Sequence, residues 1–535
     1  MTQMTLSPFE QTITANGSND LDSANPTGAS GSAEWQLSAA NYIPQKLVGE
    51  IVSPRPDAET DTNSARAYYR KNHSQVTYRV RIAVIGMAWP FKYTLTSAPA
   101  GATIGSELTR SVDGATGKTL HQWGTDYAVV ECSPANMGTG TASFTAQVED
   151  QAGTTKTVSW TSARDDTAFV FIDAGAAGND GAAGTYAAPL KTFDVGLWES
   201  SDAASTYAGK IAVFRAGTYA VGMGTPATNL TINTSVKPAT YMAFPTESVT
   251  LDCSDSHWFA NGTTQEDLSV IGCIVDGSRT AANVRVFNLG SVSDRITFWD
   301  NTFSNIGPST TGTDNPCCIG FFDNGTRRSY ISIVDNTTAS TVTLQTVCTF
   351  ASDYVCIENN DGLQTADGTN DSNGLFHIRI KDDTRYCTVR ANVTGGDCGS
   401  AGIEFTNQNG LTGNTDQEAC WNRVYCVTSG VAAGIIWNSN VNSNETSRTF
   451  DYRNSILNTT GRAYRIYTKN TVNVPVLVSA SAYYGSAASV IFDSGSTEVL
   501  PASIELTLSD FTAAGLLTGT ARTSYLGTKG AEVAG

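Results

Sequence analysis

A short stretch of the chain concentrates side chains that are able to move protons. In Phe376-His-Ile-Arg-Ile380 the apolar residues alternate with polar ones, so in a strand His377 and Arg379 face solvent. The same alternation in Gly402-Ile-Glu-Phe405 points Glu404 outward. A carboxylic acid and a second carboxylate placed on either side of a glycosidic bond can protonate the leaving oxygen and activate water. Glycan cleavage is therefore the chemistry that these residue types suit.

The spacing of these segments allows their strands to stack. If the strand of Phe376 stacks on the strand of Ile403, 27 residues later, then His377 and Glu404 become neighbours in one column. Equivalent positions on stacked parallel strands lie roughly 4.8 Å apart, so acids one strand apart approach the separation of a retaining glycosidase pair. Acids two strands apart approach the upper end of the inverting range. No local motif is needed for such a site.

The segment Tyr354-Val-Cys-Ile-Glu358 is expected to form the preceding strand, with Glu358 near Arg379. Arg379 would then fix a charged or hydroxyl-rich sugar, and with His377 it could instead support β-elimination of a uronate. The competing interpretation is a set of ordinary solvated ion pairs. The candidate catalytic residues are Glu358, His377 and Glu404, and the candidate substrate-binding residues are Arg379, Asp361 and Asp397.

The sequence lacks the motifs that are typical of several other reaction classes. There is no Gly-x-Ser-x-Gly elbow and no His-Glu-x-x-His, the four histidines are far apart, and no cysteines form Cys-x-x-Cys. The loop from Asp367 to Gly374 alternates oxygen ligands, but Ser372 and Ile378 stand where a calcium loop has its Gly and its closing Glu. We therefore predict a solvated turn there, and neither a metal nor a cofactor.

The composition and charge of the chain exclude some classes of binding partner. The chain has 535 residues, 49 glycines, 16% charged residues and a net charge of −17, without a basic run. Nucleic acid and anionic membranes need clustered positive charge, so neither is expected as a partner. The apolar stretches are shorter than the roughly 20 residues of a membrane span. No export signal is visible, and the odd count of eleven cysteines favours reduced core thiols and assembly in a reducing cytoplasm.

The first 163 residues divide into two parts. Residues 1–45 lack a periodic pattern and are interpreted as a leader or attachment segment. Residues 46–163 contain short alternating runs such as Tyr78–Ile85 and Ser143–Val148, which predict an antiparallel β-sandwich. The segments Tyr93–Ile104 and Gln147–Gly153 resemble those of immunoglobulin-like or cadherin-like modules.

Residues 164–475 carry the pattern of a solenoid. Gly396, Gly430 and Gly461 follow similar strand-turn units and lie 34 and 31 residues apart, a plausible length for one coil. Trp299 and Trp437 fall in strand alternation and are expected in the core. After Val474 the repeat fades, and residues 476–535 are expected to form a β cap or oligomerisation region.

The start of this region resembles right-handed parallel β-helix proteins, a family that includes pectate-lyase-like enzymes and bacteriophage tailspikes. The matching segments are Phe169–Asp173, Asn179–Gly181, Gly184–Thr192 and Ile211–Tyr219. The predicted fold class is therefore all-β, with an Ig-like or cadherin-like β-sandwich followed by a right-handed parallel β-helix and a C-terminal cap.

The resemblance to tailspikes implies a function. It implies a homotrimer in a virion tail, assembled in the host cytoplasm, whose N-terminal region docks on tail or baseplate proteins. It also implies that the β-helix binds, and often cleaves, a bacterial cell-surface polysaccharide, and we expect hydrolysis. Two alternatives stay open: a non-catalytic virion structural or adhesion protein, and a polysaccharide lyase of the pectate-lyase-like type.

Overall fold

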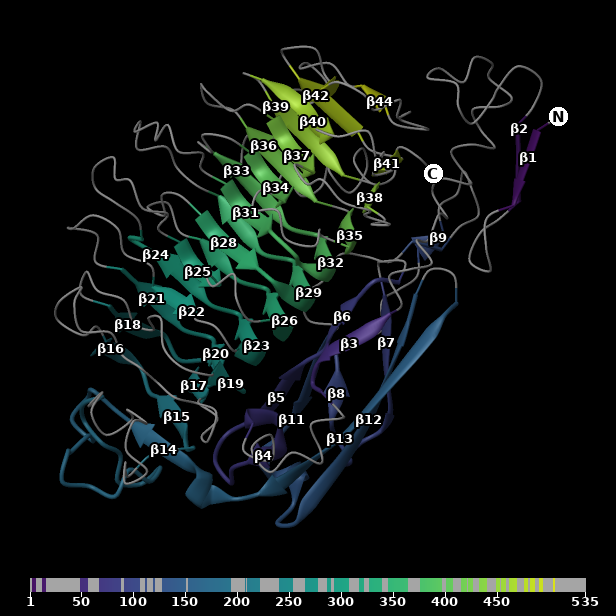
Figure 1. Ribbon diagram of the computed structural model, residues 1–535. Helices are drawn as coiled ribbons and strands as arrows, with labels where there is room; N and C mark the ends of the chain where they lie inside the picture. Colours follow the sequence, from purple (N-terminus) through teal and green to yellow (C-terminus); the bar gives the residue numbers. More distant parts are fainter. Residues whose placement is uncertain are drawn as a thin grey trace.

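The computed structural model shows a β-rich chain with an antiparallel N-terminal unit and a parallel β-helix (Figure 1). It describes residues 2–5, 12–15, 49–55, 67–87, 91–105, 111–112, 119–120, 128–150, 153–193, 207, 209–221, 240–253, 265–277, 286–289, 293–306, 317–321, 327–338, 345–363, 376–396, 401–407, 415–420, 422–426, 433–439, 449–452, 454–458, 461–468, 476–479, 482–485, 490–493 and 504–505. Two short antiparallel pairs stand apart from both units: β1 (Thr2–Thr5) with β2 (Thr12–Ala15), and β9 (Ser111–Val112) with β10 (Thr119–Leu120).

The N-terminal unit is built from strands with the predicted period of two. Along β12 the buried residues alternate with more exposed ones, and Phe144 stacks between Tyr78 and Trp160 at ring-centroid distances of 5.1 and 5.2 Å. Its immunoglobulin-like or cadherin-like character stays a prediction. The sheets are β5 (Tyr78–Arg81), β11 (Val129–Cys132) and β8 (Thr103–Ile104); β4 (Lys71–Asn72), β13 (Thr155–Arg164), β12 (Thr141–Glu149) and β7 (Lys92–Ser97); and β3 (Glu50–Ser53) with β6 (Ala83–Ile85). The short helices are η3 (Tyr68–Arg70), α2 (Pro134–Met137) and η5 (Asp166–Ala168).

The β-helix consists of three parallel sheets. In the described residues its first coils have strands in sheets 1 and 2, and from β20 onward the chain visits all three sheets in turn. Sheet 1 contains β14 (Phe169–Ile172), β15 (Ile211–Phe214), β17 (Thr240–Ala243), β20 (Ser269–Ile271), β23 (Ser293–Trp299), β26 (Arg328–Val334), β29 (Ser352–Glu358), β32 (Arg385–Arg390), β35 (Thr415–Cys420), β38 (Thr449–Tyr452) and β41 (Val476–Ser479), with β19 (Gln265–Glu266) pairing β23. Sheet 2 contains β16 (Gly217–Ala220), β18 (Val249–Asp252), β21 (Ile274–Asp276), β24 (Thr302–Ser304), β27 (Thr337–Thr338), β30 (Asp361–Leu363), β33 (Val393–Gly396), β36 (Arg423–Cys426), β39 (Ser455–Asn458), β42 (Ala482–Gly485) and β44 (Ile504–Glu505). Sheet 3 contains β22 (Phe287–Leu289), β25 (Cys317–Phe321), β28 (Gln345–Phe350), β31 (Phe376–Lys381), β34 (Ala401–Asn407), β37 (Ala433–Ser439), β40 (Arg462–Thr468) and β43 (Val490–Asp493).

These sheets confirm the predicted all-β class and its parallel solenoid. Parallel pairing continues through β41, β42, β43 and β44, so the described residues after 475 extend the same three sheets. The predicted C-terminal cap otherwise lies outside the described residues. In the part of the chain that the structure covers, no helix is long and apolar enough to cross a membrane.

The solenoid core is filled by the inward side chains of all three sheets. Ile378 and Ile380 lie in it as predicted, and Trp437 stacks on Phe405 with ring centroids 3.8 Å apart. Trp299 is also buried, but it points outward from sheet 1 into the apolar cluster of the N-terminal unit. The seven cysteines whose side chains the structure describes are buried and form no disulfide. Inward burial along stacked strands is what holds successive coils together.

A buried column of asparagines lines the turn from sheet 1 to sheet 2. From Asn301 to Asn422, each side-chain amide donates a hydrogen bond of 2.9–3.1 Å to the side-chain oxygen of the next asparagine, and a second one to a strand carbonyl of the preceding coil. The amide of Asn454, the last member, donates instead to Asp451 and to the Ala419 carbonyl. The column satisfies backbone groups that the turn would otherwise leave buried without partners. We call it the asparagine ladder, and its members are Asn301, Asn336, Asn360, Asn392, Asn422 and Asn454.

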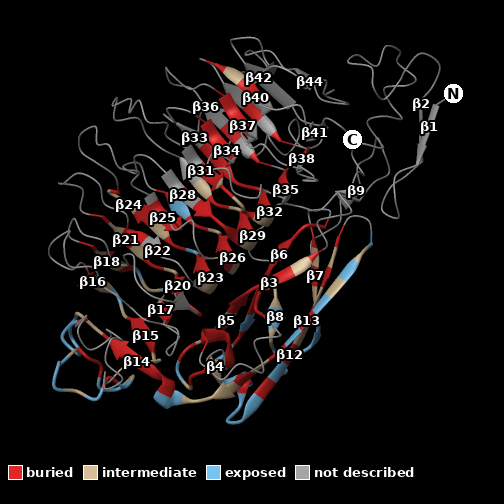
Figure 2. Cartoon of the chain, viewed as in Figure 1, coloured by how far each residue is buried: buried red, intermediate tan, exposed pale blue. Residues whose placement is uncertain are grey.

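The N-terminal unit covers the outer face of sheet 1, which is buried over most of its length (Figure 2). Ile271, Trp299, Val334 and Cys356 project outward from this sheet and share one apolar cluster with the N-terminal unit. Strands β3 and β6 are the parts of that unit that contact sheet 1 most closely. The outer face of sheet 1 is therefore an interface within the chain.

Candidate functional site

Arg379 and Glu404 are the two predicted site residues that the structure brings together. They are direct neighbours on β31 and β34 of sheet 3, and Arg379 Nε lies 2.8 Å from Glu404 Oε2. The predicted stacking of these two strands is correct, but the predicted register is wrong. Ile378 pairs with Ile403, so the partner of Glu404 is Arg379 and not His377.

The environment of Glu404 raises the pKa of its carboxyl group. The residue is 4% exposed, and burial raises the pKa of its carboxyl group above the usual value, while Arg379 and Lys381 offset only part of that effect. A carboxyl group with a raised pKa is suited to donate a proton, which is the role that the sequence assigned to one member of the set.

The surroundings of Arg379 and Glu404 restrict the access of a sugar substrate to this pair. The described outward side chains of sheet 3 are buried around it, except for Lys381, whose ammonium lies over the Phe350 ring. A sugar must reach within hydrogen-bond distance of a catalytic carboxyl. Among the described residues, none of the neighbours of Glu404 leaves an open path by which a polymer could reach its carboxyl group. The buried outward residues are Phe350, Arg379, Glu404, Thr406 and Ile436.

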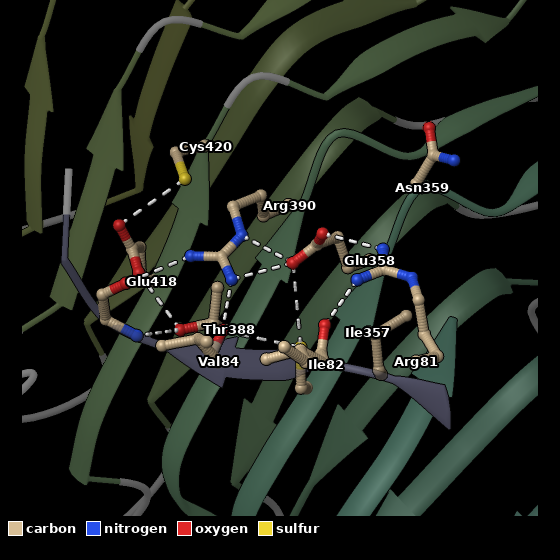
Figure 3. Close-up of polar contacts among 12 residues, drawn as sticks. Arg81, Ile82, Val84, Ile357, Glu358, Asn359, Thr388, Arg390, Glu418 and Cys420 are labelled. Atoms are coloured by element: carbon tan, nitrogen blue, oxygen red, sulfur yellow. Dashed lines mark hydrogen bonds and ion pairs between the residues drawn. The ribbon is translucent and has the colours of Figure 1, made fainter. Parts of the chain in front are cut away.

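Glu358 lies on another sheet, so the prediction that it neighbours Arg379 is wrong. It ends β29 of sheet 1, where its register neighbours are Val334 and Arg390. One carboxylate oxygen accepts a hydrogen bond of 3.0 Å from Arg81, and the other accepts bonds of 2.7 and 3.0 Å from Arg390 (Figure 3). Glu358 is therefore placed between two buried guanidinium groups.

This arrangement fixes the charge of Glu358. Burial alone would raise the pKa of its carboxyl group, but the charges and hydrogen bonds of Arg390 and Arg81 outweigh burial and leave the pKa below its usual value. Arg81 also pairs with Asp335 at 2.7 Å. A carboxyl group with a lowered pKa, whose two oxygens both accept hydrogen bonds from guanidinium groups, is poorly suited to act as a general acid. Its contacts belong to the interface between the two units.

The same interface continues along the outer face of sheet 1. The backbone N–H of Gly86 donates to the Thr388 hydroxyl at 2.9 Å, and that hydroxyl donates to Glu418 at 3.0 Å. Arg390 donates to the carbonyl oxygens of Gly86 and Val84 (Figure 3). We call this set the docking network. It comprises Arg81, Val84, Gly86, Asp335, Glu358, Thr388, Arg390 and Glu418.

The remaining predicted residues have separate outcomes. His377 lies in β31, but its side chain is outside what the structure describes. Asp397 lies outside the described residues, as does the loop from Asp367 to Gly374. Asp361 begins β30 on sheet 2, where it is half-buried. The roles assigned to all six residues stay predictions. In the described ranges no group of three potential ligands is arranged to hold a metal ion.

Sheet 2 is the sheet whose described outward side chains reach solvent. In β16, β18, β21 and β24 a buried central residue alternates with flanking residues that are half-buried or exposed. The flanking residues stack in register from coil to coil. One column comprises Thr218, Thr250, Ile274, Thr302, Thr337 and Asp361, and the other comprises Ala220, Asp252, Asp276 and Ser304.

Two carboxylates are direct neighbours on this accessible face. Asp252 and Asp276 pair across β18 and β21, which is the separation of one coil. Asn305 donates to both oxygens of Asp276 at 2.9 and 3.0 Å and so holds that carboxylate in place. Adjacent acids on stacked strands were predicted from the sequence, but between residues 354 and 405. The alternation of apolar and polar residues in β18 and β21 is the sequence signal that predicts an outward orientation for Asp252 and Asp276.

The chain shows a weak structural similarity to a solved protein. No family model matches the chain, and no curated protein matches it. The crystal structure of pectate lyase Pel9A aligns with a TM-score of 0.32 and 11% identity, covering 63% of this chain and 73% of the other. A match at that level does not establish a shared activity, so the function must be argued from the residues.

Proposed function

We propose that this protein binds a hydroxyl-rich polysaccharide along the outer face of sheet 2. The observation that carries the proposal is that the described polar side chains of this sheet reach solvent in register, whereas most described outward side chains of the other two sheets are buried. Hydroxyl groups of Thr and Ser both donate and accept hydrogen bonds, and Asp accepts them from sugar hydroxyls. A ladder of such groups, one step of roughly 4.8 Å per coil, suits an extended polymer.

The charge of the outer face of sheet 2 indicates which kind of polysaccharide would bind there. From β16 to β30 the described outward residues of sheet 2 include Asp252, Asp276 and Asp361 but no Lys or Arg. With a net charge of −17, the chain repels acidic polymers at low ionic strength. We therefore propose a neutral bacterial cell-surface polysaccharide as the partner, rather than a uronate-rich one.

The biological setting follows from the resemblance to tailspikes. We propose a homotrimeric receptor-binding protein of a virion tail, attached through its N-terminal region and assembled in the host cytoplasm. The buried, reduced cysteines support assembly in a reducing compartment. Mass measurement in solution tests the trimer, and a monomer at micromolar concentration would contradict it.

Binding to isolated polysaccharide tests the proposed face. We expect Thr337→Lys and Asp276→Asn to weaken binding of host capsular polysaccharide or lipopolysaccharide at least tenfold, because each removes a sugar-facing group from the ladder. Thr157→Lys is the matched control, since Thr157 is an exposed strand residue of the N-terminal unit. Equal binding by all three variants and the unmodified protein would contradict the assignment of this face.

Hydrolysis is a second candidate function, favoured by the accessible pair of Asp252 and Asp276. We expect Asp252→Asn and Asp276→Asn each to abolish the release of new reducing ends, and Glu358→Gln, if it folds, to leave that release unchanged. Glu404→Gln tests whether Glu404, the candidate acid on sheet 3, contributes to that release. Appearance of unsaturated uronate absorbance would instead indicate the lyase alternative. Binding without any cleavage would identify a non-catalytic adhesion protein.

A further inference from the structure

A buried carboxylate lies inside the β-helix core near its carboxy-terminal coils. Asp451, in β38 of sheet 1, is fully buried and points toward sheet 3. Its Oδ2 accepts a hydrogen bond of 3.0 Å from the Trp437 indole. Its Oδ1 accepts bonds of 2.9 Å from the Tyr464 hydroxyl and 2.7 Å from the Asn454 amide. These donors come from β37, β40 and the asparagine ladder.

Every group that faces Asp451 in the described residues is neutral. Its register neighbours are Ala419 on β35 and Val478 on β41, and Tyr464 is the titratable side chain in contact with it. No charged residue acts on the carboxylate there, in contrast to Glu358 between its two guanidiniums. The ionised form thus has hydrogen bonds but no countercharge within the core.

The balance of these effects places the titration near neutral pH. Burial raises the pKa of Asp451 to about 6, although the bonds from Trp437, Asn454 and Tyr464 favour the charged form. An ionised carboxylate in an apolar core is relieved of its desolvation cost when the surrounding strands open to water. The strands around Asp451 therefore open more easily after its carboxyl group has released a proton to solvent.

We propose that Asp451 is a proton-operated latch for the carboxy-terminal coils of the β-helix. The protonated carboxyl group keeps β37, β38 and β40 closed. Loss of its proton loosens these three strands and leaves the earlier coils unchanged. The latch responds to pH independently of the polysaccharide-binding face, which lies on other coils.

Hydrogen exchange of the full-length chain between pH 4.5 and 8 tests the latch. After division by the intrinsic exchange rate, opening of β37, β38 and β40 is expected to increase as the pH rises through about 6. Between pH 4.5 and 8 the increase should be roughly 25-fold, because the pKa differs by about two units between the folded protein and water and part of the effect falls below pH 4.5. Strands β20 and β23, which are remote from Asp451 along the solenoid, provide the internal control.

Two variants separate the latch from general destabilisation. Asp451→Asn should give opening that no longer depends on pH across this range. Tyr464→Phe keeps the ring but removes a donor to the carboxylate, so the midpoint should move to higher pH. An unchanged profile in Asp451→Asn, or an unchanged midpoint in Tyr464→Phe, would overturn the proposal. If Asp451→Asn does not fold, the pH midpoint of opening in Tyr464→Phe tests the proposal by itself.

Discussion

Glu358 and Glu404 are two buried glutamates whose neighbours shift their pKa values in opposite directions. Glu358 contacts two guanidinium groups and has a lowered pKa, whereas Glu404 contacts one and has a raised pKa. The number of buried countercharges decides which effect wins, because burial opposes ionisation at both sites. In sequence, both residues stand at strand positions with the same alternation, so this difference is invisible there.

Substitution of Glu358 should therefore destabilise the fold strongly. Glu358→Gln leaves Arg81 and Arg390 buried without their shared anion, which typically costs about 3–5 kcal/mol. The urea midpoint at pH 7 should fall accordingly. Because the folded pKa of Glu358 is lowered, its contribution is present above the unfolded pKa of about 4.5 and is lost as the pH falls through the folded value.

The matched control is Glu404→Gln. At pH 7 this change removes a charge that burial already disfavours, so the urea midpoint should fall less than in Glu358→Gln. Below pH 4 the difference between the two variants should shrink, because Glu358 approaches its protonated form in the unmodified protein as well. Equal midpoints for Glu358→Gln and the unmodified protein at pH 7 would refute the structural role assigned to Glu358.

The register error at Glu404 has a physical origin. Successive members of the asparagine ladder are 24 to 35 residues apart, so the length of a coil varies and cannot be extrapolated from one repeat to the next. Alternation predicts which face a side chain takes, as for Ile378 and Ile380, but not which residue lies beside it. Likewise, Arg81 lies 277 residues before Glu358, a distance that no local spacing encodes.

At the scale of elements, the asparagine ladder is the feature that fixes each turn between sheet 1 and sheet 2. The residue before the ladder asparagine has a positive φ at several coils, with values of 59° at Asp300, 58° at Asp335 and 56° at Asn359. Such a residue redirects the chain sharply, and the asparagine then satisfies the backbone groups inside the turn. The repeat of Asn-rich turns was visible in sequence, but the inward orientation of the side chains was not.

Removal of one ladder member should cost at least about 2 kcal/mol. Asn360→Ala removes the partners of the Asn336 backbone N–H and the Ile333 carbonyl in the ladder, at about 1–3 kcal/mol for each buried group, whereas the Asn392 side-chain oxygen keeps its bond from the backbone N–H of residue 360. Chemical unfolding measures the loss. The control is Asn305→Gly, because Asn305 has a φ of 51° that glycine adopts without strain. Its amide bonds Asp276 at the half-buried surface, and its loss should cost less than about 1 kcal/mol. Similar losses in both variants would contradict a special role for the ladder.

At the scale of the whole molecule, the N-terminal unit and the β-helix share one interface. The apolar cluster joins both units, and the docking network places Arg81 against Asp335 and Glu358 of the solenoid. Antiparallel patterning in residues 46–163 and parallel repeats after residue 164 were both readable in sequence. Their docking was not, because the outward residues of sheet 1 mix apolar side chains such as Val334 with charged ones such as Arg390, and this mixture does not distinguish an interface from a solvated face.

Weakening this interface should divide the unfolding of the chain into two steps. Arg81→Met removes the cation that links the N-terminal unit to Asp335 and Glu358, and it leaves those carboxylates with less buried countercharge. Unfolding of the unmodified protein should couple the two units in one calorimetric transition, because each covers apolar surface of the other. In Arg81→Met the N-terminal unit should melt first and separately. Arg79→Met is the control, since Arg79 is a partly exposed neighbour whose ion pairs lie at 3.4 and 4.0 Å. A single transition at an unchanged temperature in Arg81→Met would show that apolar contact alone joins the two units.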